Sequence, residues 1–474
     1  MIKDLTEGNP QKMLWQFTIP MFISVIFQQL YSIADSVIAG KFAGEDALAA
    51  VGASYPITMI FMAVAVGSNI GCSVVISQLF GAKQYKQMKT AVSTTIIASL
   101  ALSVLLTVAG LLGSRSLMTM INTPENIFAD GDLYLRIYIG GFLFLFLYNV
   151  ATGIFTSLGD SKTPLYFLIG SSVGNIVLDT LFVAVFHWGV AGVAWATFLA
   201  QGVACVLALF TLGIRLKTVK TEGAIERFSG QMLKKIGMIA IPSILQQSFI
   251  SVGNIFVQSL VNSCGSSVIA GYSAAMKLNT FTITSFTTLG NGISSFTAQN
   301  MGAGRYDRVK QGLHAGMKLA FTIAVPFFLA FFVFSKGVLG LFMNQDSQLA
   351  MDTGIAFLRI VAPFYFIISI KLLADGVLRA SEAMKEFMTA TFSDLILRVI
   401  LAYVLMIPFG TNGIWMSWPV GWVIGTILSF GFYKKGKWMK KSVVANASKR
   451  DTIVIALNEE ERAGGNYAEG VGTE

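Results

Sequence analysis

Long apolar segments alternate with short polar segments along almost the whole chain. A helix needs about 20 apolar residues to cross a bilayer, and each of these segments comes close to that length or exceeds it. We predict twelve transmembrane helices, at about residues 14–39, 47–79, 88–112, 132–158, 164–188, 190–213, 233–262, 266–301, 311–342, 352–381, 386–409 and 411–433. The pattern therefore predicts an all-α polytopic membrane protein.

The composition supports this class. Of the 474 residues, 54% are hydrophobic and 12% are charged, whereas a soluble protein carries about 25% charged residues. The net charge of +9 does not indicate nucleic-acid binding, because the basic residues lie in short loops between apolar segments. The three cysteines have no paired spacing, which argues against a disulfide framework or a metal site. The first apolar segment is too long for the core of a signal peptide.

The two halves of the chain repeat each other. The segment SQLFGAK (77–83) aligns with AQNMGAG (298–304) at an offset of 221 in the numbering, and LRI (135–137) aligns with LRI (358–360) at an offset of 223. Gly153 then falls on Gly376 at the second of these offsets. With six spans in each half, both halves enter the membrane from the same side, so we predict two pseudo-symmetric six-helix bundles around a cleft.

The Lys and Arg residues predict the orientation. One set of loops holds Lys83, Lys86, Lys89, Lys162, Arg215, Lys217, Lys220, Arg227, Arg305, Arg308, Lys310, Arg379, Lys385, Lys434, Lys435 and Lys437. The opposite loops hold little beyond Lys41, Arg115 and Lys336. The richer set predicts the cytoplasmic side, with both termini inside.

The same pattern divides the chain into four regions. We expect an N-lobe (1–214), a cytoplasmic loop between the lobes (215–232), a C-lobe (233–441) and a disordered cytoplasmic tail (442–474).

Two acids lie within apolar segments of the first half. Asp35 is in the first segment, and Asp179 follows Asn175 by four residues in the fifth, which places both on one helical face. Thr197 lies in the sixth segment. Carboxylate, amide and hydroxyl oxygens are ligands for a hard cation such as Na+, and a desolvated carboxylate also binds H+. Two alternatives remain open: Asp35 reaches the lipid headgroups, or Asp179 has a structural hydrogen bond.

The second half has a different charge pattern. Its first two spans contain no Asp or Glu, and the later spans contain Lys371 with Asp375 and Asp394 with Arg398, each pair at i,i+4. By the offset of 223, Arg398 occupies the place of Asn175. A guanidinium only donates hydrogen bonds, so we predict no matching cation site there.

Polar side chains within the spans predict a substrate cavity. The candidates are Gln28, Gln29, Asn69, Asn149, Gln246, Gln247, Asn254, Asn279 and Asp375. Nothing matches a Walker loop, a zinc HExxH motif or a catalytic triad. We therefore expect no enzyme activity, no cofactor and no direct use of ATP.

Several of these segments together resemble one known family. They are the paired GAK/GAG loops, Gly159-Asp160-Ser161-Lys162-Thr163-Pro164, Asn175-Ile-Val-Leu-Asp179 and Gly189-Val-Ala-Gly192. Over about residues 10–440 the chain resembles the multidrug and toxic compound extrusion (MATE) family, and within it the bacterial MepA-like branch.

The resemblance implies a V of two lobes in the bacterial inner membrane. It also implies exchange of H+ or Na+ for small cationic amphiphilic compounds, with an ion or proton site whose residues match Asp35, Asn175, Asp179 and Thr197. Some members also use an acid in the seventh helix, which this chain lacks. We expect a monomer.

Two other functions compete with drug export. A flippase for a lipid-linked or anionic substrate would need cavity cations, for which Lys277, Lys371 and Arg398 are the candidates. A membrane receptor or scaffold would leave Asp35 and Asp179 without a role.

Overall fold

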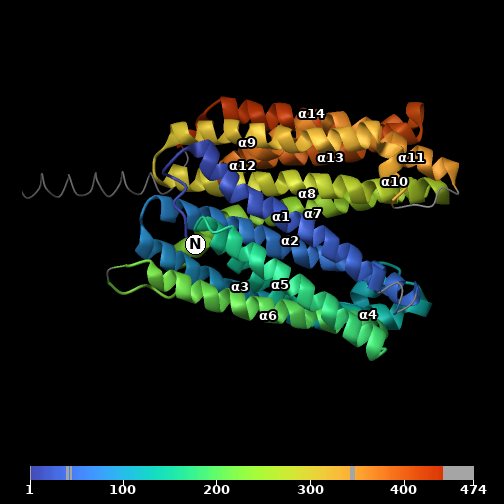
Figure 1. The fold of residues 1–474 in the computed structure, drawn as a ribbon, viewed down its shortest axis with the longest axis horizontal. Coiled ribbons are helices and arrows are strands. Elements are labelled where there is room, and N and C mark those ends of the chain that lie inside the picture. The colour runs from blue at the N-terminus through green and yellow to red at the C-terminus, as the bar shows by residue number, and fades with distance from the viewer. Residues whose placement is uncertain (1, 39–41, 43–44, 222, 342–346, 441–474) are drawn as a thin grey trace, which may run out of the picture.

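The computed structural model describes residues 2–38, 42, 45–221, 223–341 and 347–440. Every regular element in these ranges is helical. The predicted tail from 442 lies outside the described residues. Figure 1 shows two stacks of long helices that lie close together at the end where the N-terminus is and diverge toward the other end.

The first half of the chain forms the lower stack of Figure 1 together with the helix between the stacks. Its elements are α1 (Pro10–Ile38), α2 (Glu45–Gly81), α3 (Tyr85–Met120), α4 (Glu125–Ser157), α5 (Lys162–Asp179), the π-helical η2 (Thr180–Val185) and α6 (Gly189–Thr218). Its core joins Phe142, Phe146 and Phe155 of α4 to small and branched residues of α2 and α6.

The second half forms the other stack. Its elements are α7 (Gly230–Asn262), α8 (Ser266–Gly302), α9 (Tyr306–Phe328), the π-helical η3 (Leu329–Val333), α10 (Ser335–Leu339), α11 (Gln348–Val361), the 3₁₀ turn η4 (Ala362–Phe364), α12 (Tyr365–Ala380), α13 (Met384–Phe409), α14 (Thr411–Lys434) and the 3₁₀ turn η5 (Lys437–Lys440). In its core Tyr272 stacks on Trp415, and Phe357 packs edge-to-face against both rings.

The prediction of twelve long helices in two bundles is confirmed. Eleven spans within the described residues are long and apolar enough to cross a membrane. The twelfth, α8, is 37 residues long, and its run of Ser, Thr, Asn and Gln explains why it is not among the eleven. The tenth predicted span is not one continuous helix, because Pro363 lies in the 3₁₀ turn that separates α11 from α12.

Helices from the two halves also pack against each other. Ideal Cβ atoms added at Gly67 and Gly71 of α2 would lie 2.4–2.7 Å from atoms of Ile244 and Ala240 of α7, so these glycines let the two backbones approach. Gly170 and Gly174 of α5 have the same spacing, but no heavy atom of the described residues lies within 4 Å of a Cβ placed there. Close packing of α2 on α7 therefore links the stacks.

Helix α1 contacts both stacks. Trp15 Nε1 donates to the carbonyl of Ala315 on α9 (3.2 Å), and Thr18 lies against Gly292 of α8. The later part of α1 packs on α5. Figure 1 shows α1 crossing the space between the stacks. A displacement of one bundle relative to the other must therefore bend or slide α1.

Candidate functional site

Among the acids of the first half whose burial the structure describes, the most deeply buried lies at the end of α5. Asp179 is 0% exposed and Asn175, one turn earlier, is 2% exposed. The Asn175 amide is satisfied when its nitrogen donates to Asp179 Oδ2 (2.8 Å) and its oxygen accepts from the backbone amide of Thr197 (3.1 Å). In the opposite orientation the nitrogen reaches Thr197 Oγ1 at 3.4 Å. The predicted trio of Asn175, Asp179 and Thr197 is thus brought together.

Helix α1 forms the third side of this site. The hydroxyl of Tyr31 accepts from the Asn175 nitrogen at 3.2 Å. Asp35 lies one helical turn after Tyr31 in α1, but its side chain is outside the described part of the protein. Its place in the predicted site therefore stays a prediction.

Local interactions mark the start and the end of α5. At its start, Asp160 accepts from the amide (3.1 Å) and the hydroxyl (2.8 Å) of Thr163. Directly after Asp179 the helix widens into η2, a register change of the kind that often occurs at functional sites.

A small cavity lies beside Thr197. Its volume is about 10 Å³, close to what one water molecule needs, and its lining includes Thr197, Tyr134, Tyr138 and Gln201. The Gln201 Oε1 atom is buried and makes no hydrogen bond within the described residues. A mostly apolar, water-sized space therefore adjoins Thr197, whose backbone amide donates to Asn175.

The arrangement suits binding of a small cation or a proton. Ionised carboxylates are costly to bury unless they are paired, hydrogen-bonded or protonated. Asp179 supplies a carboxylate, and Tyr31 and Thr197 supply hydroxyl oxygens, which are the ligand types that hard cations take.

A comparison with protein families decides the identity. The MatE family model matches residues 20–181 and again residues 242–404. The chain belongs to the MatE family. The start points of the two matches, at 20 and 242, are related by nearly the same offset as the sequence repeat. Members are transporters, so this MatE protein is not an enzyme.

Curated and solved relatives support the same family. The probable multidrug resistance protein YpnP of Bacillus subtilis is 30% identical over 92% of this chain and 97% of its own length. The multidrug export protein MepA of Staphylococcus aureus is 23% identical over 85% and 89%, and a FAD transporter of Shewanella oneidensis is 23% identical over 71% and 75%.

The fold agrees with that of a MOP superfamily transporter from Pyrococcus furiosus, which is described as having a binding pocket of reverse polarity. The TM-score is 0.85 and the identity 25%, over 93% of this chain and 98% of that one.

The predicted cavity residues of this MatE protein are distributed over both bundles. Asn69 Nδ2 donates to the Asn149 carbonyl (2.8 Å) within the N-terminal bundle, and Asn279 Oδ1 accepts from Tyr365 (3.1 Å) within the other. Asp375 is also buried, whereas Gln28 is exposed. The remaining candidates are partly exposed on α1 and α7 or buried on α7: Gln29, Gln246, Gln247 and Asn254. Their role in binding substrate stays a prediction.

The C-terminal bundle of this MatE protein holds a buried charge cluster. Lys371 Nζ lies 2.9 Å from Asp375 Oδ2 and 3.5 Å from Asp394 Oδ2. The first pair was predicted. The second corrects the predicted pairing of Asp394 with Arg398, since Arg398 instead stacks on the Trp418 ring at 4.2 Å and donates to Asn254 Oδ1 (3.4 Å).

Arg379 also differs from its predicted position. We assigned it to a loop, but it is 5% exposed in α12 and donates to Asn291 Oδ1 at 3.0 Å. Within its described residues, the C-terminal bundle therefore buries three cationic side chains, of Lys371, Arg379 and Arg398, and the two carboxylates of Asp375 and Asp394.

Sequence reasoning missed two residues of the N-terminal site. Tyr31 precedes Asp35 by four residues, and this spacing on a predicted helix could have indicated it. Gln201 follows Thr197 at the same spacing and could have been found in the same way.

Proposed function

We propose that this MatE protein exports small cationic amphiphilic compounds across the bacterial inner membrane in exchange for H+ or Na+. The observation that carries the proposal is the buried Asn175–Asp179 pair, with Tyr31 and Thr197 around it. An acid buried within a membrane span is costly to keep without a functional role. The names of YpnP and MepA, which refer to multidrug resistance and export, support the substrate class.

The proposal places the converging end of the bundles in the cytoplasm. That end carries the loops rich in Lys and Arg, which the positive-inside rule assigns to the cytoplasmic side. Both termini would then be cytoplasmic. The chain would act as a monomer, with each lobe contributing one wall of the substrate path.

Transport by the purified protein in proteoliposomes tests this function. The assay follows a fluorescent cationic dye while pH and Na+ gradients are imposed separately. We expect one gradient to drive the dye, and we expect Asp35→Asn and Asp179→Asn each to reduce driven transport to the level of empty liposomes. Their carboxylates would be the groups that exchange the ion.

The matched control is Asp130→Asn, the same change at an exposed acid of α4. It should transport as the unmodified protein does. Full gradient-driven transport by both the Asp35 and the Asp179 variants would refute the N-terminal site. Dye movement that neither gradient drives would refute antiport.

A second candidate is export of an anionic amphiphile or an anionic lipid-linked compound. Three buried cations beside two carboxylates leave the interior of the C-terminal bundle with a positive excess. The FAD transporter relative and the reverse-polarity pocket of the Pyrococcus protein support this alternative. The same liposomes loaded with FAD in place of the dye distinguish the two substrate classes.

A further inference from the structure

Two buried glutamines connect the bundles at the end where they converge. Gln78 of α2 donates through Nε2 to the carbonyl of Ala380, the last residue of α12 (2.8 Å). Gln299 of α8 donates through Nε2 to the carbonyl of Ser157, the last residue of α4 (2.8 Å). Both glutamines are almost completely buried. Each bond therefore runs from one half of the chain to the other.

The two bonds are copies of each other under the internal repeat. Gln299 corresponds to Gln78 at the offset of 221, and Ala380 corresponds to Ser157 at the offset of 223, which are the two offsets of the sequence repeat. Both acceptors are carbonyls at the C-terminal end of a helix, where no amide of the same helix is available to donate. Each bundle thus supplies one glutamine that caps the C-terminal end of a helix in the other bundle, and the two caps are related by the pseudo-two-fold axis.

Two glycines make this approach possible. A Cβ on Gly81 would lie 1.9 Å from the carbonyl oxygen of Gln299, and a Cβ on Gly302 would lie 1.9 Å from that of Gln78. These glycines are related by the same offset as the two glutamines. The bundles are thus in backbone contact on both sides of the pseudo-two-fold axis.

We propose that Gln78 and Gln299 are a matched pair of latches that hold this end of the transporter closed, and that both release when this end opens. This inference rests on the proposed function, because alternating access requires the two bundles to separate here. Separation breaks both bonds at once, since each joins opposite bundles. Water then solvates the freed amides and carbonyls, so the latch is strong enough to favour closure and weak enough to reverse.

The N-terminal segment, residues 3–8, strengthens one of the two latches. The Lys3 amide donates to the Leu158 carbonyl of the first bundle (3.0 Å), and the Leu5 amide donates to Gln299 Oε1 (2.8 Å). Arg308 of α9 donates to the carbonyls of Gly8 (2.7 Å), Glu7 (3.0 Å) and Leu5 (3.2 Å). Among the described residues, the Gln299 side chain therefore has two hydrogen-bond partners and the Gln78 side chain has one. Substitution of Gln299 should favour opening of this end more than substitution of Gln78.

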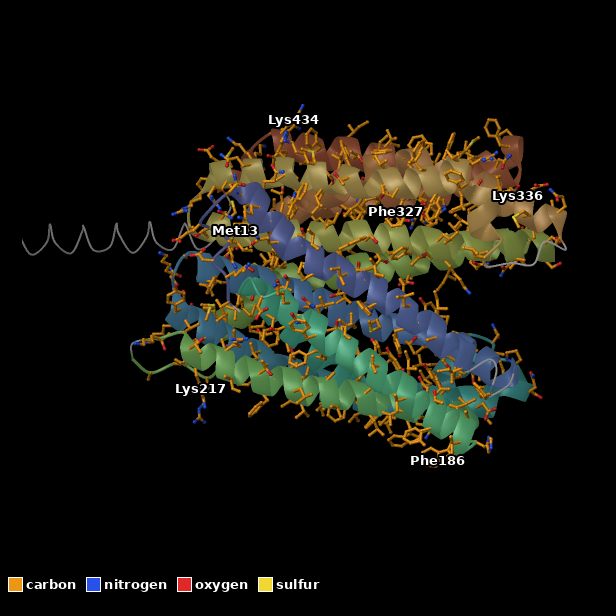
Figure 2. All side chains as sticks on the ribbon, viewed as in Figure 1. Met13, Phe186, Lys217, Phe327, Lys336 and Lys434 are labelled. Carbon is orange, nitrogen blue, oxygen red and sulfur yellow. The ribbon has the colours of Figure 1, made fainter. Side chains whose placement is uncertain are left out.

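Distances between spin labels test the latch directly. Cysteines at Lys217 and Lys434 report on the converging end (Figure 2). On the other end, one cysteine replaces Lys336 (Figure 2) and the other replaces Glu125, the first residue of α4. Of the native cysteines, Cys72 and Cys205 are buried, and Cys264 is replaced by Ala. The protein is studied as the full chain in detergent and in lipid nanodiscs.

We expect Gln78→Met to lower the ratio of closed to open molecules by about five- to tenfold, which corresponds to one lost hydrogen bond. We expect Gln299→Met to lower it further, because that change removes two hydrogen bonds. The Lys217–Lys434 distance should lengthen and the Glu125–Lys336 distance should shorten. The shift should be larger for Gln299→Met and largest for the double variant. The control is Gln87→Met, the same change at an exposed glutamine of α3.

Arg308→Met provides a second test, because it removes three of the hydrogen bonds that hold the N-terminal segment without altering either buried glutamine. It should produce a smaller shift in the same direction. Unchanged distances in all three folded variants would refute the latch. Dye transport by the unmodified protein is measured separately, so a failed antiport assay with shifted distances would refute the proposed function and leave the latch intact.

Discussion

At the residue scale, the two bundles differ in the charged residues that they bury. In the N-terminal site Asp179 accepts from the Asn175 amide, whereas Lys371 lies between two carboxylates. Helix α14 accommodates that cluster through glycines. A Cβ on Gly425 would lie 2.5 Å from Lys371 Cε, and one on Gly421 would lie 2.7 Å from Asp394 Oδ1. The Lys371 ammonium group thus lies beside Asp375, where a free cation would have to bind.

Lys371→Met should destabilise the protein strongly. It leaves Asp375 and Asp394 buried without their shared cation, and breaking a buried pair costs about 3–5 kcal/mol. Thermal unfolding of the purified protein in detergent measures the loss. Adding Asp394→Asn to Lys371→Met should recover part of it by removing one unpaired carboxylate.

The control for that experiment is Arg398→Met. Since Asp394 forms its ion pair with Lys371 at 3.5 Å and Arg398 stacks on Trp418, this variant should lose less stability than Lys371→Met. Equal losses would mean that Arg398 is the true partner of Asp394. Sequence spacing alone suggested that partner, because i,i+4 neighbours on one helix are visible in a sequence and neighbours on α12 and α13 are not.

At the element scale, hydropathy predicted the helices but not their interruptions. A run of about 20 or more apolar residues predicts a spanning helix whatever its partners, which is why the spans other than the more polar α8 could be located from hydropathy. The π-helical turn after Asp179 and the 3₁₀ turn at Pro363 depend on neighbouring helices or on a single residue. The repeat predicted that Gly153 matches Gly376, yet it did not predict what each glycine contacts.

Gly376→Ala should be more destabilising than Gly153→Ala. A Cβ on Gly376 would lie 2.4 Å from the backbone carbonyl of Gly290, which cannot move without shifting α8. A Cβ on Gly153 would lie 2.4 Å from Asn69 Oδ1, at the end of a side chain that can rotate. We expect a cost of about 1–3 kcal/mol for Gly376→Ala from overpacking. Thermal unfolding of both variants gives the comparison, and an equal or larger loss for Gly153→Ala would contradict it.

At the scale of the whole molecule, the repeat predicted two bundles, and the structure adds how they meet. The contact is symmetric at the converging end, where Gln78 and Gln299 cap each other's bundles, and asymmetric elsewhere, where α1 and residues 3–8 cross between them. A sequence shows which residues are equivalent under the repeat. It does not show which of them face the other bundle, because that depends on the relative position of the two lobes.

Gly81→Ala and Gly302→Ala should act as wedges between the bundles. Each added Cβ would lie 1.9 Å from a backbone oxygen of the opposite bundle, so the clash is relieved only if α2 and α8 separate. The distance between labels at Lys217 and Lys434 should lengthen. The thermal unfolding temperature should change little, because the core of each bundle is unaltered. Gly237→Ala on α7 is the control, because no heavy atom lies within 4 Å of a Cβ there. If the two alanine variants instead lower the unfolding temperature and leave the label distance unchanged, the protein unfolds before the bundles separate. The contact at the converging end would then not open during transport.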